Sequence, residues 1–218
     1  MGTLCSVFWV FKSDFLSLLF CIKDKRQKKF LELLLVGTIP TGIMGWFWGS
    51  YFVNLFKSPL LVGFMLLFTG SLIYLINTIS YGHKTINEMC FKDALWVGLF
   101  QGIAVLPGLS RSGFTIFAAI SRSLDRQTAV KYSFMLSAPA ILGATLLEAL
   151  KLFQAEAELT QLANYLLSGS MAFVFGVIAI RYFINLLIHK KFYYFAYYCW
   201  VIGLLIVAVN FLRGHSVC

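Results

Sequence analysis

Long apolar runs alternate with short polar segments along the 218 residues of the chain. A helix needs roughly 20 apolar residues to cross a bilayer. Five runs reach that length, and they lie at about 30–50, 60–79, 132–150, 165–187 and 192–212. The pattern therefore predicts an all-α, polytopic membrane protein that forms a single membrane domain over residues 1–218.

Two further apolar segments, 94–106 and 113–123, are too short to cross a bilayer singly. The segment PGLSRS joins them, and its proline and glycine break helices. We therefore predict a re-entrant helix hairpin over residues 94–123. Residues 1–11 are also short, since a helix of that length spans only about 16 Å. They predict half a span that ends where Lys12 follows.

The order of these elements predicts an inverted-repeat architecture. From residue 94 onward a hairpin is followed by three spans, and before it half a span is followed by two. Membrane proteins with broken helices are often built from two such units. Residues 94–212 are then the second repeat and residues 1–79 an incomplete first repeat, so the chain is expected to be cut at its N-terminus.

Composition and charge support this assignment. A mean hydropathy of +0.82 with only 12% charged residues excludes a soluble domain. The net charge of +9 is gathered in short clusters, KDKRQKK at 23–29 and HKK at 189–191, which favours cytoplasmic loops over a nucleic-acid site. Both ends of the hairpin then face the cytoplasm, and its loop is expected at mid-depth in the membrane.

The hairpin loop carries an arginine, and a lone arginine at this depth costs roughly 2.5–3.5 kcal/mol on insertion scales. Arg111 therefore needs a partner. Its neighbours suggest an anion: glycines let backbone approach a ligand, hydroxyl groups can hold oxygens, and a helix N-terminus favours negative charge. Arg111 offers a planar fork that matches phosphate. These neighbours are Gly108, Ser110, Ser112, Gly113 and Thr115.

The expected ligand is thus a phosphate held within the membrane, and hence one that is half lipid. Gln101 lies on the first short helix of the hairpin and is expected either to orient this ligand or to bond a neighbouring helix. Five cysteines stand singly without ligand spacing, so they predict neither a metal site nor a disulfide framework.

The quoted residues resemble a known family. FQGIAVLPGLSRSGFT (100–115) and YSFMLSAPAILGAT (132–145) resemble the second signature of the bacterial undecaprenyl-diphosphatase, or bacitracin-resistance protein, family, and GTIPTGIMG (37–45) is similar to an early span of that family. The resemblance implies hydrolysis of undecaprenyl diphosphate in the bacterial inner membrane, which recycles the lipid carrier of peptidoglycan synthesis. It also implies two facing hairpins and a divalent cation (Mg²⁺ or Ca²⁺). A homodimer is compatible with these expectations.

The resemblance assigns roles to the hairpin residues. Arg111 would clamp the diphosphate, while Ser110, Ser112 and Thr115 would hold its oxygens as the other catalytic residues. The residues expected to bind the substrate are Gly108, Gly113 and Gln101.

One part of the family pattern is missing. The first signature, a glutamate-rich hairpin with an E-x-x-x-E pair and a Ser-Ser-Thr-Gly-His run, has no match in these 218 residues. The metal ligands that the resemblance implies are therefore not expected in this chain. The chain is expected to bind polyprenyl diphosphate weakly and to hydrolyse it poorly or not at all. Two alternatives stay open: a broken-helix transporter or flippase for an anionic lipid, and an inactive, truncated member of the family.

Overall fold

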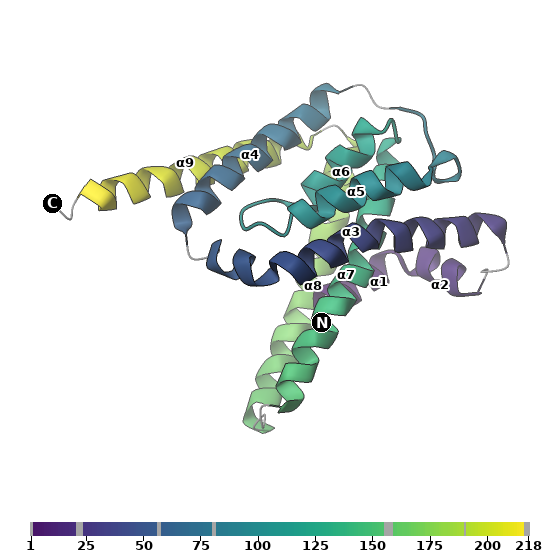
Figure 1. Cartoon of the computed structure of the whole chain (residues 1–218), viewed down its shortest axis with the longest axis horizontal. Helices are drawn as coiled ribbons and strands as arrows, with labels where there is room; N and C mark the ends of the chain where they lie inside the picture. The colour runs from purple at the N-terminus through teal and green to yellow at the C-terminus, as the bar shows by residue number, and fades with distance from the viewer. Residues whose placement is uncertain are drawn as a thin grey trace.

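The computed structural model of the chain describes residues 2–20, 24–55, 58–79, 82–154, 159–189 and 191–215, and helices dominate it (Figure 1). The elements, in chain order, are α1 (Gly2–Val10), α2 (Lys12–Phe20), α3 (Lys25–Leu55), α4 (Pro59–Thr78), the 3₁₀ turn η1 (Ile86–Glu88), α5 (Phe91–Ile103), α6 (Arg111–Ser121), α7 (Arg126–Gln154), α8 (Leu159–Ile188) and α9 (Tyr193–His215).

Five of these helices, α3, α4, α7, α8 and α9, are long and apolar enough to cross a membrane. They match the five predicted runs, which confirms the all-α, polytopic class. Their axes are not all parallel: α3, α4 and α9 run across the view of Figure 1, whereas α7 and α8 run steeply downward. Three expectations stay predictions: the depth of the hairpin loop in the membrane, the side of the membrane from which the hairpin enters, and the division into repeats 1–79 and 94–212.

The predicted hairpin is present as α5 and α6, but both helices begin two to three residues earlier than the apolar pattern indicates. The reason is capping by polar residues, which a count of apolar residues leaves out. Asp93 accepts a hydrogen bond from the amide of Cys90 at 3.0 Å at the start of α5. Ser110 accepts one from the amide of Gly113 at 3.2 Å at the start of α6.

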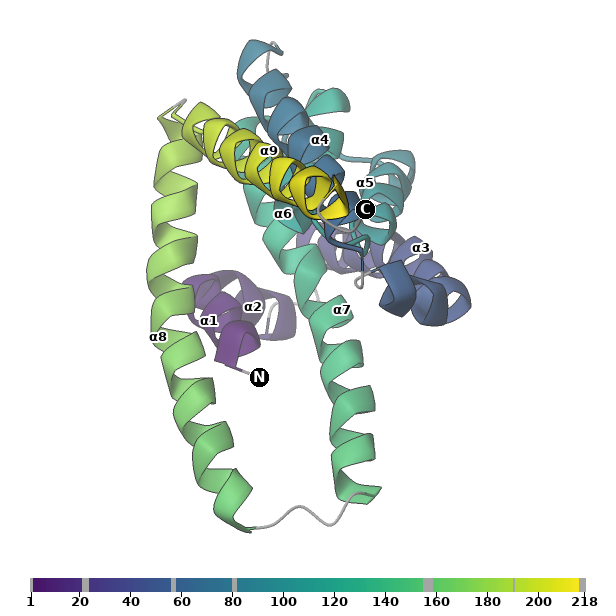
Figure 2. The same cartoon turned by 90° about the vertical axis from the view of Figure 1, so that its left-hand side faces the viewer.

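Helix α2 is not predicted by the sequence pattern. A short helix is present within residues 1–11 as α1, which ends before Lys12 as predicted, and the chain then forms a second short helix that begins at Lys12. That α1 crosses half of a membrane stays a prediction. Asp14, in the first turn of α2, forms an ion pair with Lys131 of α7. This distant partner makes a charged helix start tolerable there. Helix α1 lies between α7 and α8 (Figure 2), whereas α2 contacts α1 and α3.

Close contacts through glycines bring the helices around the hairpin together. A Cβ added to Gly98 of α5 would lie 2.1 Å from the carbonyl oxygen of Gly37 on α3. Helices α4 and α9 lie side by side, where a Cβ on Gly63 would lie 3.2 Å from the carbonyl oxygen of Gly203. Backbone contacts of this kind are typical of helices that pack in membranes.

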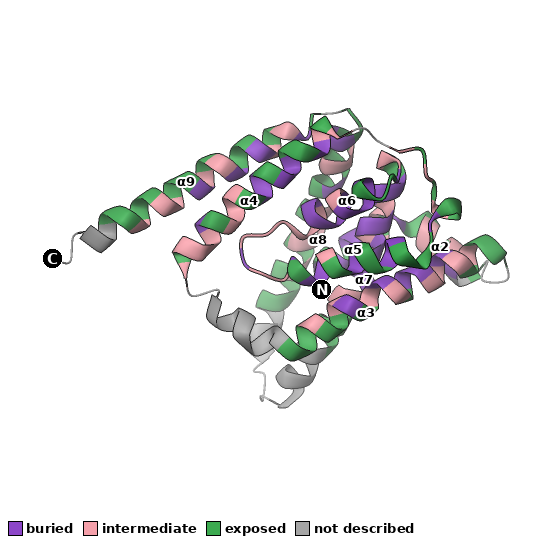
Figure 3. Cartoon of the chain, turned by 45° about the horizontal axis from the view of Figure 1, so that its top comes forward, coloured by how far each residue is buried: buried purple, intermediate pink, exposed green. Residues whose placement is uncertain are grey.

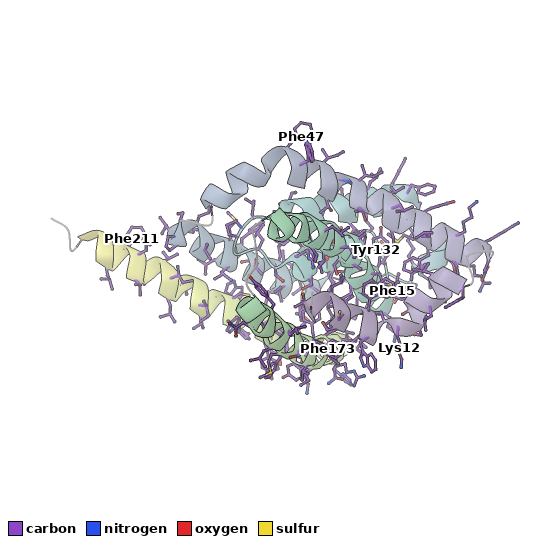
Figure 4. All side chains as sticks on the ribbon, turned by 90° about the horizontal axis from the view of Figure 1, so that it is seen from below. Lys12, Phe15, Phe47, Tyr132, Phe173 and Phe211 are labelled. Carbon is purple, nitrogen blue, oxygen red and sulfur yellow. The ribbon has the colours of Figure 1, made fainter. Side chains whose placement is uncertain are left out.

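The buried core lies where α3, α5, α6 and α7 meet (Figure 3). Tyr132 of α7 is fully buried there and donates a hydrogen bond to the carbonyl oxygen of Leu33 at 2.7 Å. In contrast, Phe47 and Phe211 lie on the outside of the molecule (Figure 4). Exposed aromatic and aliphatic side chains of this kind suit contact with lipid.

Candidate functional site

The loop between α5 and α6 is shaped by Gly108. This residue has a φ of +89°, a conformation that side chains with a Cβ rarely adopt. A Cβ here would also lie 2.6 Å from the carbonyl oxygen of Val62 on α4. Gly108 therefore permits both the turn and the close approach of the loop to α4, and the neighbouring Pro107 is buried.

The N-terminus of α6 points toward this loop with free hydrogen-bond donors. Ser110 caps the helix by accepting from Gly113, and a Cβ on Gly113 would lie 3.2 Å from the Ser110 hydroxyl oxygen. No hydrogen bond among the described residues uses the amides of Arg111 and Ser112, or the Ser112 hydroxyl. These groups are available to an anion, which the positive end of the helix dipole favours.

Arg111 is half-buried at the first position of this helix. Arg111 takes part in none of the ion pairs within the described part of the chain. These pairs are Lys84–Asp93, Arg122–Asp93 and Lys131–Asp14. A cation at the positive end of a helix is also electrostatically unfavourable. Both observations make this end of α6 a favourable place for an anion.

Thr115 lies one turn further along α6, and its side chain is buried. Its hydroxyl donates to the carbonyl oxygen of Arg111 at 2.9 Å and also forms a hydrogen bond with the Ser133 hydroxyl of α7. The expectation that Thr115 holds a substrate oxygen stays untested. The contacts that it makes here support the first turn of α6 from behind.

Gln101 is fully buried on α5 and contacts two neighbouring helices. Its amide nitrogen donates to the hydroxyl of Thr41 on α3 at 3.1 Å and to the carbonyl oxygen of Leu136 on α7 at 3.4 Å. Its side-chain oxygen has no partner among the residues that the structure describes. The structure thus contains the helix-bonding role expected for Gln101, and ligand binding by this side chain stays a prediction.

Thr69 of α4 is a site residue that sequence reasoning missed. Its buried hydroxyl accepts from the amide of Ser110 at 3.2 Å and donates to the carbonyl oxygen of Gly108 at 3.1 Å. A threonine within an apolar run gives no signal of this contact, because the loop lies about 40 residues further along the chain.

Asp93 was also missed, although a carboxylate three residues after a helix cap is a recognisable signal. It is fully buried and binds Lys84 and the Nε of Arg122, the latter at 2.8 Å. Burial alone would raise the pKa of Asp93, but the hydrogen bonds from Lys84, the Cys90 amide and Arg122 outweigh it and hold that pKa well below its ordinary value. This cluster closes the end of the hairpin opposite to Arg111.

The side chains of the described residues do not form a binding site for a divalent cation. They contain no group of three or more His, Cys, Asp and Glu side chains that could hold a metal. Asp14 and Asp93 are paired with basic side chains, and Asp125 caps α7 through the amide of Thr128 at 2.9 Å. Oxygen ligands for Mg²⁺ or Ca²⁺ are therefore not assembled near Arg111 by this part of the chain.

Comparisons with known proteins agree with the motif. The family described as "Bacitracin resistance protein BacA" matches residues 1–205. The chain is 42% identical to the undecaprenyl-diphosphatase of Halothermothrix orenii over 94% of this chain and 79% of that protein. It is 38% identical to undecaprenyl-diphosphatase 3 of Bacillus cereus, over 98% of this chain and 81% of the relative. The undecaprenyl-diphosphatase of Alkaliphilus metalliredigens is 38% identical over 97% of this chain and 82% of that protein.

Proposed function

Because this chain belongs to the family of the bacitracin resistance protein BacA, we propose that it hydrolyses undecaprenyl diphosphate to undecaprenyl phosphate and inorganic phosphate. A water oxygen bonds to the terminal phosphorus, and the bond from that phosphorus to the bridging oxygen breaks. The bridging oxygen leaves on the lipid monophosphate, which can again carry cell-wall precursors.

The observation that carries the proposal is that Arg111 stands at the N-terminus of α6 and forms no ion pair with the residues that the structure describes. The diphosphate supplies the missing negative charge. Its oxygens accept hydrogen bonds from the Arg111 fork and from the amides of Arg111 and Ser112. As the bond to the bridging oxygen breaks, these donors stabilise the charge that develops, which is the main source of catalysis in phosphoryl transfer.

The hydroxyl groups complete the phosphate pocket in this proposal. Ser112 has a hydroxyl that is not used within the described chain, and the Ser110 hydroxyl can still donate its proton while it caps α6. Thr115 holds the carbonyl oxygen of Arg111 and so supports the turn that presents the guanidinium. Gly108 and Gly113 shape the loop in this proposal, because a Cβ at Gly108 would lie 2.6 Å from the carbonyl oxygen of Val62 and a Cβ at Gly113 would lie 3.4 Å from Ile73.

The polyprenyl tail would lie against apolar side chains beside the loop. Phe68 of α4 is 53% exposed, and its ring centroid lies 5.9 Å from that of Phe114, in the first turn of α6. Ile103, the last residue of α5, is also exposed. Phe68 lies beside the first turn of α6 through its contact with Phe114, so in this proposal the lipid tail lies along Phe68 while the head group reaches Arg111.

We extend the proposal to the bacterial inner membrane, where five apolar helices would anchor the protein. No catalytic step is routed through a divalent cation, because the described residues do not assemble ligands for one. A transporter or flippase that moves an anionic lipid is not favoured, because the similar proteins are named for phosphatase activity.

The test is phosphate release from undecaprenyl diphosphate by the purified chain in detergent, with Mg²⁺, with Ca²⁺ and with a chelator. We expect Arg111→Ala to lower kcat/KM by about 100- to 1,000-fold, the effect of removing a donor to a developing charge. Arg122→Ala is the matched control, since Arg122 also stands between two serines but binds Asp93. It should stay within about threefold of the wild type.

Equal losses in the two variants would contradict the role of Arg111. Movement of the lipid between leaflets of a vesicle without phosphate release would support the transporter instead. The same assay measures whether the wild-type chain turns over slowly, as expected from the missing first signature.

A further inference from the structure

A single hydroxyl group from outside the hairpin holds the backbone of its loop at two points. Thr69 lies on α4, and its side chain is 1% exposed. Its Oγ1 accepts a hydrogen bond from the amide of Ser110 and donates one to the carbonyl oxygen of Gly108. The two loop groups face the same side, because Gly108 turns the chain with its positive φ.

This use of a threonine differs from that of two other threonines in the long helices, Thr38 and Thr78. Thr38 of α3 and Thr78 of α4 both donate to carbonyl oxygens of their own helix, at 2.7 and 2.9 Å. A hydroxyl that bonds within its own helix contributes little to packing between helices. Thr69 instead satisfies a donor and an acceptor of the loop, and a buried backbone group left without a partner is costly.

The face of α4 that carries Thr69 contacts the loop and α6 along its length. The carbonyl oxygen of Val62 approaches Gly108, and Ile73 lies within 3.4 Å of where a Cβ of Gly113 would be. Positions 62, 69 and 73 are spaced by seven and four residues, so they share one side of a helix. Helix α4 therefore forms a wall for the site, and Thr69 is its hydrogen-bonding point.

We propose that Thr69 is a positioning residue for the phosphatase reaction. It acts through Ser110: by holding the Ser110 amide, it sets where α6 begins and hence where the Arg111 guanidinium and the free amides point. This inference rests on the proposed function only for its effect on turnover. The anchoring of the loop is a separate physical property that can be measured without substrate.

The test compares Thr69→Val with Thr69→Ser. Valine keeps the shape of threonine but can make neither hydrogen bond, whereas serine can make both. We expect Thr69→Val to lower kcat on the order of 10- to 100-fold, the scale of a small misplacement of catalytic groups. KM should change less than about threefold, because the lipid tail and the charge of Arg111 still attract substrate. Thr69→Ser should recover kcat to within about threefold of the wild type.

The matched control is Thr78→Val on the same helix, which removes a hydroxyl bonded only within α4. It should leave kcat unchanged. A second measurement, amide hydrogen exchange by mass spectrometry on peptides that contain Ser110, reads the anchor directly. Exchange should become faster at Ser110 in Thr69→Val, and it should stay at the wild-type rate in Thr69→Ser and Thr78→Val.

The inference is overturned if Thr69→Val keeps both the wild-type kcat and the wild-type exchange rate at Ser110. It is also overturned if Thr78→Val loses as much kcat as Thr69→Val, or if Thr69→Ser does not restore kcat. If the wild-type chain releases no phosphate, the proposed function fails, and the exchange measurement alone then decides whether Thr69 anchors the loop. If Thr69→Val is recovered unfolded, Thr69→Ala replaces it, and kcat equal to that of Thr69→Ser would overturn the inference.

Discussion

The buried carboxylate of Asp93 allows a quantitative test of what holds the hairpin closed. We consider Asp93→Asn, which keeps the shape of the side chain but removes its charge. A hydrogen bond to a charged group is worth about 1.5–3 kcal/mol, and Asp93 binds two cations. The side chains of Lys84 and Arg122 are 26% and 43% exposed, so in the variant both can turn to water. After this discount for solvent screening, we expect a loss of about 2 kcal/mol in the free energy of unfolding.

The assay is equilibrium unfolding of the protein in detergent micelles, followed by tryptophan fluorescence. Asp24→Asn serves as the control, because Asp24 is exposed and its carboxylate accepts a hydrogen bond from the amide of Arg26 at the start of α3. Asparagine caps helices equally well, so this control should change the free energy of unfolding by less than about 0.5 kcal/mol. The kcat of Asp93→Asn should stay within about threefold of the wild type, because α6 separates Asp93 from Arg111 by about 16 Å.

An unfolding free energy for Asp93→Asn within about 0.5 kcal/mol of the wild type would refute this reasoning. It would mean that the cost of burying the carboxylate cancels its hydrogen bonds. A large loss of kcat without a loss of stability would instead place Asp93 in the reaction.

Three further predictions concern acid, packing and the support of α6. The pKa of Asp93 is depressed in the folded state. Its contribution to the free energy of unfolding is therefore present above the unfolded pKa of about 3.9 and is lost as pH falls toward the folded value. In a pH series of unfolding curves, the stability difference between wild type and Asp93→Asn should be constant from pH 8 to about 5 and shrink below about 4. Gly98→Ala should destabilise the protein by about 1–3 kcal/mol, because the new Cβ would meet the Gly37 carbonyl. Gly42 has open space around it, so Gly42→Ala should be neutral or stabilising by up to about 1 kcal/mol in the same unfolding assay. Thr115→Val should lower kcat by about tenfold, since it releases the Arg111 carbonyl, and Thr115→Ser should restore it; equal kcat in both variants would contradict this support.

The pattern of apolar residues predicts the elements whose formation depends on local composition. Five spans follow from run length, and the hairpin follows from Pro107 and Gly108 between two short runs. The exact helix starts at Phe91 and Arg111 require hydrogen bonds from Asp93 and Ser110. These polar residues fall outside an apolar count, which explains why the predicted boundaries are late.

Contacts between distant segments are the part that the sequence does not predict. Helix α2 begins at Lys12, and its Asp14 pairs with Lys131, which lies 117 positions later. Gln101 bonds Thr41, 60 residues away, and Thr69 reaches Ser110, 41 residues away. No local pattern identifies such partners, although the motif itself is sufficient to place Arg111, Ser110 and Gly113 in one turn.

The closed base of the hairpin has a consequence for how the chain enters a membrane. The amide of Lys84 donates to the carbonyl oxygen of Ser123 at 3.2 Å, and the amide of Asp125 donates back to Lys84 at 3.1 Å. Together with the Asp93 cluster, these bonds join the two ends of a segment of about 40 residues before any distant helix is needed. A segment stapled in this way can insert tip first, after its flanking spans are in place. If the hairpin is re-entrant with its loop at mid-depth, as the sequence predicts, none of the charges at its base crosses the bilayer, and Arg111 is the cation of its loop that is drawn inward.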